Sequence, residues 1–124
     1  MTRWAVLFLG MAGLAIAQPC STGTPACAEP LPMGKGFVTI YRSHPLAKGH
    51  SKATRALVVI HGASRNADDY FPSGMAGAYL AGALENTVVV APRFAGSGGR
   101  NCDDKLAPGE IGFACSGNDW RGGG

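Results

Sequence analysis

Serine hydroxyls are the side chains of this chain best suited to nucleophilic chemistry, provided that the fold makes one of them reactive. A nucleophilic serine typically lies in a Gly-x-Ser-x-Gly motif, on a tight turn between a strand and a helix. No segment of the 124 residues matches that motif fully, but three segments approach it, around Ser51, Ser64 and Ser97. Only Ser64 follows a strand-like run and precedes a helix-like one, and its motif carries Asn66 in place of the second glycine.

The surroundings of Ser64 predict a strand–helix–strand unit. Residues 56–60 (ALVVI) and residues 87–91 (TVVVA) are continuous apolar runs, typical of strands that are buried on both faces of a parallel sheet. Between them, Asn66 can cap a helix, Pro72 interrupts its first turns, and helical spacing begins at Ser73. The apolar residues at that spacing are Met75, Tyr79, Leu80, Ala83 and Leu84. We therefore predict an α/β fold that contains a βαβ unit with parallel strands.

Two blocks within this unit carry a family resemblance. Residues 61–70 read HG-x-x-R-N-A-D-x-Y, and residues 89–94 read V-V-A-P-R-F. With these blocks the sequence resembles secreted, esterase-type members of the α/β-hydrolase superfamily, over residues 37–124. The resemblance implies a partial α/β-hydrolase domain, holding the N-terminal portion of that sheet. It also implies hydrolysis of a small-molecule ester or similar acyl substrate by a Ser-His-Asp triad, with no cofactor and no metal.

The same resemblance assigns roles to residues of the turn after the first apolar run. In α/β-hydrolases the turn after the third strand supplies one oxyanion-hole donor. Carried over, this donor is the backbone N–H of Ala63, with Ser64 as the alternative. Gly62 lets the chain approach a substrate oxygen closely, and His61 is expected to brace the loop rather than to act as a base. A strand-to-helix turn without function is the other interpretation of these residues.

The remaining catalytic residues are not found in the chain. The triad of this superfamily runs in the order Ser, then Asp or Glu, then His. The histidines are His44, His50 and His61, and none of them follows Ser64 or Ser97. The nucleophile and the base are therefore expected beyond the last residue, and no residue of the chain is assigned as the acid. A small exported binding module that uses the βαβ core as a scaffold is the alternative function, and a non-functional truncated product is a third possibility.

Residues 1–17 have the features of a cleaved signal peptide. Arg3 precedes an uncharged, mostly apolar run, which ends in Ala15-Ile16-Ala17, a pattern that signal peptidase accepts. This run is shorter than the ~20 residues that a membrane-spanning helix needs, so we expect no stable membrane anchor. We predict cleavage after Ala17 and a secreted or periplasmic location.

The cysteine pattern agrees with export. The chain has 4 cysteines, and an even number in an exported protein suggests disulfides. Of the possible pairings, the local one needs the least rearrangement of the chain, and it joins Cys20 to Cys27 and Cys102 to Cys115. The absence of a Cys-x-x-Cys motif argues against a zinc or redox site.

The rest of the chain carries weaker patterns. Residues 18–36 are rich in Pro, Gly, Ser and Thr and predict an irregular leader, and residues 37–41 form a short β-type run. The formal net charge is +3 with scattered basic residues, which argues against a nucleic-acid partner. Residues 93–124 show no periodicity. Their acidic residues predict a solvated loop, with calcium binding the less favoured alternative; these residues are Asp103, Asp104, Glu110 and Asp119.

Overall fold

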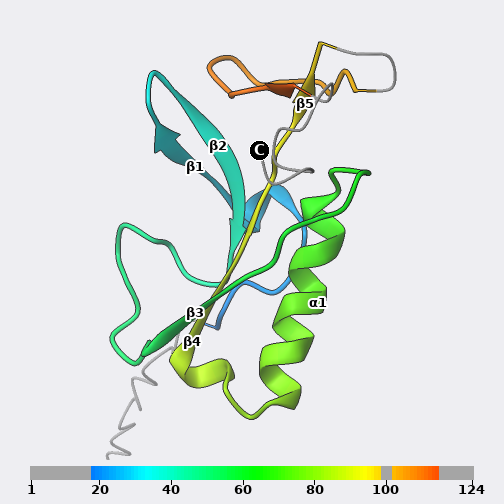
Figure 1. Ribbon diagram of the computed structural model, residues 1–124. Coiled ribbons are helices and arrows are strands. Elements are labelled where there is room, and N and C mark those ends of the chain that lie inside the picture. Colours follow the sequence, from blue (N-terminus) through cyan, green and yellow to red (C-terminus); the bar gives the residue numbers. More distant parts are fainter. Residues whose placement is uncertain (1–17, 99–101, 115–124) are drawn as a thin grey trace, which may run out of the picture.

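The computed structural model describes residues 18–98 and 102–114 (Figure 1). In chain order the elements are η1 (Pro25–Cys27), β1 (Ala28–Met33), β2 (Gly36–Arg42), β3 (Arg55–Val58), α1 (Ala67–Leu80), η2 (Leu84–Asn86), β4 (Thr87–Pro92), β5 (Gly96–Ser97) and β6 (Phe113–Ala114). Four strands form one mixed sheet in the order β1-β2-β4-β3, and β5 pairs with β6 in a separate two-stranded sheet. The described residues therefore have a mixed α/β architecture.

The parallel unit predicted from the two apolar runs is present. β3 pairs with β4 in parallel, with Arg55 opposite Thr87 and Val58 opposite Val90, and α1 connects the two strands. β2 joins the other side of β4 in the antiparallel direction. The prediction of a βαβ unit with parallel strands is confirmed, although β3 ends at Val58 and is shorter than the predicted run.

The prediction of an irregular leader over residues 18–36 is wrong for its second half. Residues 28–33 form β1, which pairs with β2 in an antiparallel hairpin. Pro30 and Pro32 argue against a strand at the level of sequence, because proline cannot donate a hydrogen bond to a neighbouring strand. β1 tolerates both prolines because it is an edge strand of the sheet. The tight turn of the hairpin contains Gly34, whose φ of 58° suits glycine.

Helix α1 begins earlier than the sequence indicated. It starts at Ala67 and contains Pro72, which was expected to interrupt it. Proline leaves the carbonyl four residues before it without a helical donor, and that carbonyl belongs to Asp68. In the structure the Asp68 carbonyl lies against Gly23 of the N-terminal segment, so closely that any side chain at residue 23 would collide with it. The N-terminal segment therefore packs against the carbonyl that Pro72 leaves without a helical donor.

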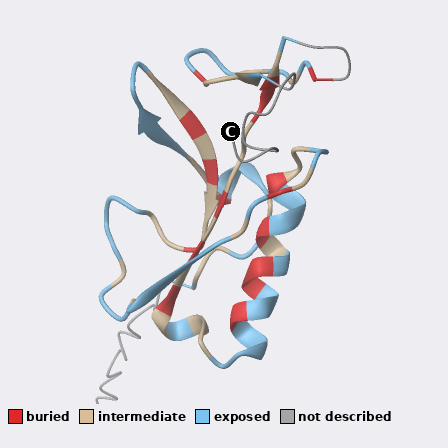
Figure 2. Ribbon diagram, viewed as in Figure 1, coloured by how far each residue is buried: buried red, intermediate tan, exposed pale blue. Residues whose placement is uncertain are grey.

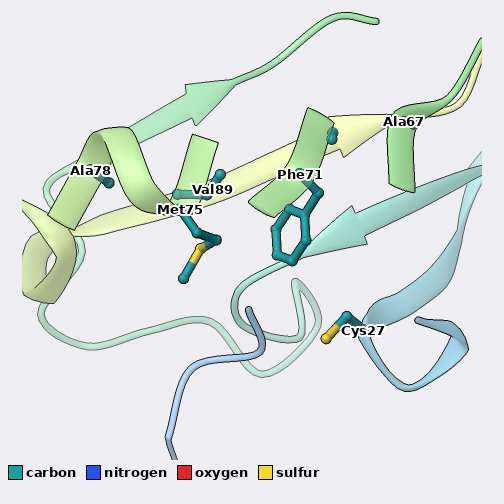
Figure 3. Packing of buried hydrophobic residues seen from close by; sticks show 7 residues of the cluster. Cys27, Ala67, Phe71, Met75, Ala78 and Val89 are labelled. Atoms are coloured by element: carbon teal, nitrogen blue, oxygen red, sulfur yellow. The ribbon is translucent and has the colours of Figure 1, made fainter. Parts of the chain in front are cut away.

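One face of α1 packs on the sheet and forms the main apolar core (Figures 2 and 3). The buried residues of this cluster are Cys27, Ala67, Phe71, Met75, Ala78, Val89 and Ala91. The buried face is rotated from the predicted one, since Tyr79 and Leu80 are 71% and 83% exposed. The predicted disulfide between Cys20 and Cys27 is confirmed and borders this core. Cys102 is buried and is not a free thiol, but its predicted partner Cys115 lies outside the described residues.

Strand β3 is not buried as its composition suggested. All four of its residues are exposed, with Leu57 at 37% and Val58 at 56%, and Ile60 beyond the strand is 44% exposed. The physical reason is position, because β3 is the last strand of the sheet and its outer edge has no neighbour among residues 18–98 and 102–114. The expectation of burial on both faces is therefore wrong for this strand.

The close approach of α1 to the sheet yields a stability prediction at Gly74. A Cβ there would lie 2.6 Å from Val59 Cγ2 and 3.1 Å from Val89 Cγ1. We expect Gly74→Ala to lower the free energy of unfolding by about 1–3 kcal/mol through overpacking. Gly77 is the matched control on the same helix, because no atom lies within 4 Å of its Cβ position.

At Gly77 alanine should instead raise the free energy of unfolding by about 1 kcal/mol through its better helix propensity. Urea denaturation of both variants, followed by circular dichroism, compares them directly. Equal stabilisation by the two substitutions would contradict the packing described for α1.

Candidate oxyanion turn

The candidate site lies where β3 and β4 leave the sheet at the same edge. His61 follows β3 after two residues of loop, and Phe94 follows β4 after one. The His61 side chain is only 2% exposed and stands edge-on to the Phe94 ring, with centroids 5.8 Å apart. The two blocks of sequence that carry the family resemblance therefore meet at this point of the structure.

Both nitrogens of the His61 ring are engaged by backbone groups. The N–H of Phe94 donates to His61 Nε2 at 2.9 Å, and because an amide can only donate, Nε2 carries no proton. The ring hydrogen is then on Nδ1, which donates to the carbonyl of Gly62 at 2.8 Å. In this arrangement the imidazole connects two loops and does not present a basic nitrogen to a substrate.

Residues 62–65 form a turn that orients one exposed amide. The N–H of Arg65 donates to the Gly62 carbonyl at 3.1 Å, so this oxygen accepts from both Arg65 and His61. In a trans peptide the C=O and N–H point in opposite directions, so the N–H of Ala63 faces away from these donors. Ala63 is exposed, and its N–H makes no hydrogen bond within the described residues.

Arg65 connects the turn to the chain that follows β4. It has a φ of 53°, the only positive value among the described residues other than glycine. Its guanidinium donates to the Ala63 carbonyl at 2.7 Å and to Asp104 Oδ2 and Oδ1 at 2.6 and 3.3 Å. The hydrogen bonds from Arg65 are the largest influence on the Asp104 carboxyl, and they hold its pKa below the ordinary value against the opposing effect of burial.

A second arginine–carboxylate pair anchors the same segment. Arg93 donates to Glu110 Oε1 at 2.9 Å, and the Glu110 side chain is only 2% exposed. Burial acts to raise the pKa of Glu110, but the N–H of Ala107, the hydroxyl of Thr39 and the charge of Arg93 outweigh it and leave the pKa lowered. Arg93 of the V-V-A-P-R-F block thus has a structural partner inside the protein.

The prediction of a solvated acidic loop holds for Asp103, which is exposed, and is wrong for Asp104 and Glu110. Asp104 and Glu110 are held in ion pairs, while Asp119 lies outside the described residues. The arginine partners could not be predicted from local spacing, because Arg65 lies 39 residues before Asp104. Within residues 18–98 and 102–114, no three His, Cys, Asp or Glu side chains gather closely enough to hold a metal ion.

The candidate serines are not joined to a histidine. Ser64 and Ser51 are exposed in loops, and Ser97 lies in β5 against Gly112. Within the described residues, a serine–histidine hydrogen bond joins Ser43 Oγ to His44 Nδ1 at 3.1 Å. Ser43 is 2% exposed and its hydroxyl accepts from the N–H of Val89, so it extends the sheet and is not accessible to a substrate.

An open depression of about 320 Å³ lies at the other end of α1. It is lined by Tyr79, Gly82, Leu84 and Glu85, whereas the oxyanion turn precedes the first residue of the helix. The two features are separated by the length of α1 (Figure 1), so this depression is not part of the candidate site.

Comparisons with protein-family models, with curated proteins and with solved structures gave no match to this chain. Among the described residues, no helix has the length and apolar character required to cross a membrane.

The bridge through His61 yields a second stability prediction. His61→Ala removes the acceptor of the Phe94 N–H and one of the two donors to the Gly62 carbonyl, both at partly buried positions. We expect the free energy of unfolding to fall by about 2–4 kcal/mol. His50→Ala is the control, since His50 bonds the Glu85 carbonyl in an exposed position, and its cost should stay below about 1 kcal/mol. Thermal and urea denaturation measure both, and equal costs would argue against the bridge.

Proposed function

We propose that this chain supplies the oxyanion-hole segment of an exported serine hydrolase of the α/β-hydrolase type. The substrate class is a small-molecule ester or a related acyl compound, and the residue that stabilises its oxyanion is Ala63, through the backbone N–H. The observation that carries the proposal is the turn at residues 62–65, which directs this N–H outward and leaves it unbonded within the described residues.

The position of the turn supports this proposal. In α/β-hydrolases an oxyanion donor comes from the loop between the third strand and the first long helix. Among residues 18–98 and 102–114, β3 is the third strand and α1 is the first α-helix, and the turn lies between them. An antiparallel hairpin that leads into parallel strands is also the way in which the α/β-hydrolase sheet begins, and β1, β2, β3 and β4 have these directions.

The chemistry of the turn suits a developing negative charge. A fixed amide stabilises an oxyanion without having to reorient during the reaction, and one such donor typically contributes ~10²–10³ in turnover. A Cβ at Gly62 would make only an ordinary contact with the Tyr70 hydroxyl, at 3.4 Å, so packing around the turn does not require glycine there. Ser64 retains only the alternative role, because its hydroxyl has no histidine partner within the described residues.

An exported location is part of the same proposal. The disulfide between Cys20 and Cys27 fits an oxidising compartment, and the first 17 residues, which lie outside the described part, have the signal-peptide features given above. The proposal includes no cofactor and no stable membrane anchor.

The chain as it stands should not hydrolyse esters. It contains no Gly-x-Ser-x-Gly motif, and no histidine follows Ser64 or Ser97. A serine hydroxyl without a base is a weak nucleophile near neutral pH. We expect p-nitrophenyl ester turnover by residues 18–124 to equal the background rate, and Ser64→Ala and His61→Ala to leave it unchanged. Turnover that Ser64→Ala abolishes would make Ser64 the nucleophile and overturn the proposed division of roles.

The role of Ala63 is tested in a product of the same gene that also carries an elbow serine. If such a sequence is encoded in frame after codon 124, Ala63→Pro in that product removes the donor N–H. Turnover should fall by ~10²–10³, as for other oxyanion donors. Ala63→Gly and Ser64→Ala retain both backbone N–H groups and serve as controls with near-normal turnover.

Circular dichroism must show that the proline variant is folded. A folded Ala63→Pro enzyme with normal turnover would refute the donor role. The absence of an encoded elbow, together with a stable monomeric chain, would favour the binding module instead.

A further inference from the structure

We propose that Asp104 is a positioning residue for the oxyanion turn and acts through Arg65. By fixing the Arg65 guanidinium, which holds the Ala63 carbonyl, it sets the direction of the Ser64 amide and supports the conformation of the turn that contains Ala63. The catalytic meaning of this inference rests on the proposed function, whereas the structural coupling between Asp104 and the turn can be measured without any activity.

The first step is the backbone of Arg65. Its φ of 53° lies in the left-handed region, which a residue with a Cβ adopts only when its surroundings hold it there. The hydrogen bond from Arg65 N to the Gly62 carbonyl, at 3.1 Å, closes the turn in this conformation. The side chain of the same residue then folds back and donates to the Ala63 carbonyl at 2.7 Å.

The second step is the direction of two successive peptide groups. His61 and the Arg65 N–H hold the Gly62 carbonyl, which turns the Ala63 N–H away from them. The Arg65 guanidinium holds the Ala63 carbonyl, which turns the Ser64 N–H away in the same manner. The orientation of the second amide therefore depends on where the guanidinium is kept.

The third step is the carboxylate that keeps it there. Asp104 accepts two hydrogen bonds from Arg65, from Nε at 2.6 Å and from a terminal guanidinium nitrogen at 3.3 Å. This forked geometry fixes both the plane of the guanidinium and its distance from the carboxylate. Asp104 is itself fixed, because Oδ2 also accepts from the N–H of Gly96 at 2.6 Å and the Asp104 N–H donates to the Gly96 carbonyl at 3.0 Å. Through Asp104, the segment after β4 thus contacts Arg65 and holds the turn that follows β3.

The charge of Asp104 persists into acid. The hydrogen bonds from Arg65 are the main reason that its pKa lies below the ordinary value of 3.8, and the N–H of Gly96 and the charge of Arg93 act in the same direction against burial. A lowered pKa in the folded protein means that the contribution is complete above the ordinary value and is lost as the pH falls through the lowered one. Protonation of Asp104, and the change that it causes in the turn, should therefore occur at a pH below that at which an ordinary aspartate is protonated.

The test compares two carboxylates that anchor the same segment. Asp104→Asn removes the charge that faces Arg65, while Glu110→Gln removes the charge that faces Arg93 and makes no contact with the turn. Amide hydrogen exchange and chemical shifts of residues 63–65, measured by NMR on residues 18–124, report the turn directly. Asp104→Asn should speed exchange of the Arg65 amide about tenfold or more, because a hydrogen bond to a charged group is lost. Glu110→Gln should leave that amide within about twofold of the parent.

Rescue and pH complete the test. Asp104→Glu restores the carboxylate on a longer side chain and should recover most of the protection at Arg65. The shifts of residues 63–65 should move in the parent only below the ordinary aspartate range and should not move in Asp104→Asn. Unchanged exchange in Asp104→Asn, or an equal change in Glu110→Gln, would overturn the positioning role. Either result is independent of ester turnover, so it is distinguishable from normal activity of Ala63→Pro, which refutes the donor itself.

Discussion

The parallel pairing of β3 with β4 is the constraint on which the described site depends. Parallel strands end at the same edge of a sheet, so the residues that follow them meet even though Phe94 lies 33 positions after His61. His61 converts this meeting into two hydrogen bonds, one to each loop. The return of the chain from β3 to β4 requires α1 to lie close to the sheet, and Gly74 provides the space for it. A change that alters the pairing would therefore alter the turn as well.

The segment after β4 is held to this framework by two carboxylates with different surroundings. The Glu110 side chain is nearly fully buried, and its carboxylate accepts hydrogen bonds from Thr39, Arg93 and Ala107. These donors compensate its negative charge. The cost of removing the two charges from water offsets much of their attraction, so the pair is weak evidence for net stability. Asp104 is partly exposed, at 22% for its side chain, and connects two loops. The pair of Glu110 with Arg93 fixes where the segment lies, and the partly exposed pair of Asp104 with Arg65 connects this segment to the turn.

The sequence predicted the elements whose signal is local and missed those that depend on neighbours. The runs at residues 56–60 and 87–91, their parallel direction and the disulfide between Cys20 and Cys27 follow from periodicity, connection length and spacing, and the structure contains them. β1 was missed because Pro30 and Pro32 are acceptable only on an edge, and edge position is a property of the whole sheet. The start of α1 was missed because Pro72 lies inside the helix, whose Asp68 carbonyl packs against Gly23 from a distant part of the sequence.

The same limit applies to the candidate site. His61, Ala63 and Ser64 could be singled out from the sequence because they lie together in one block after an apolar run. The roles of Asp104 and Glu110 could not, since each finds its arginine from a different part of the chain. Hydrogen bonds of this kind are set by the fold, and no spacing in the sequence encodes them.

The two edge strands of the sheet, β1 and β3, differ in how well each could pair with a further strand. β1 carries prolines at alternate positions, which removes hydrogen-bond donors from its strand and makes it a poor template for another chain. β3 has no proline, and its exposed residues Ala56, Leu57 and Val58 are apolar. A further strand, from this chain or from another, can therefore add to the sheet favourably only beside β3. The sheet is closed to extension on one side and open on the other.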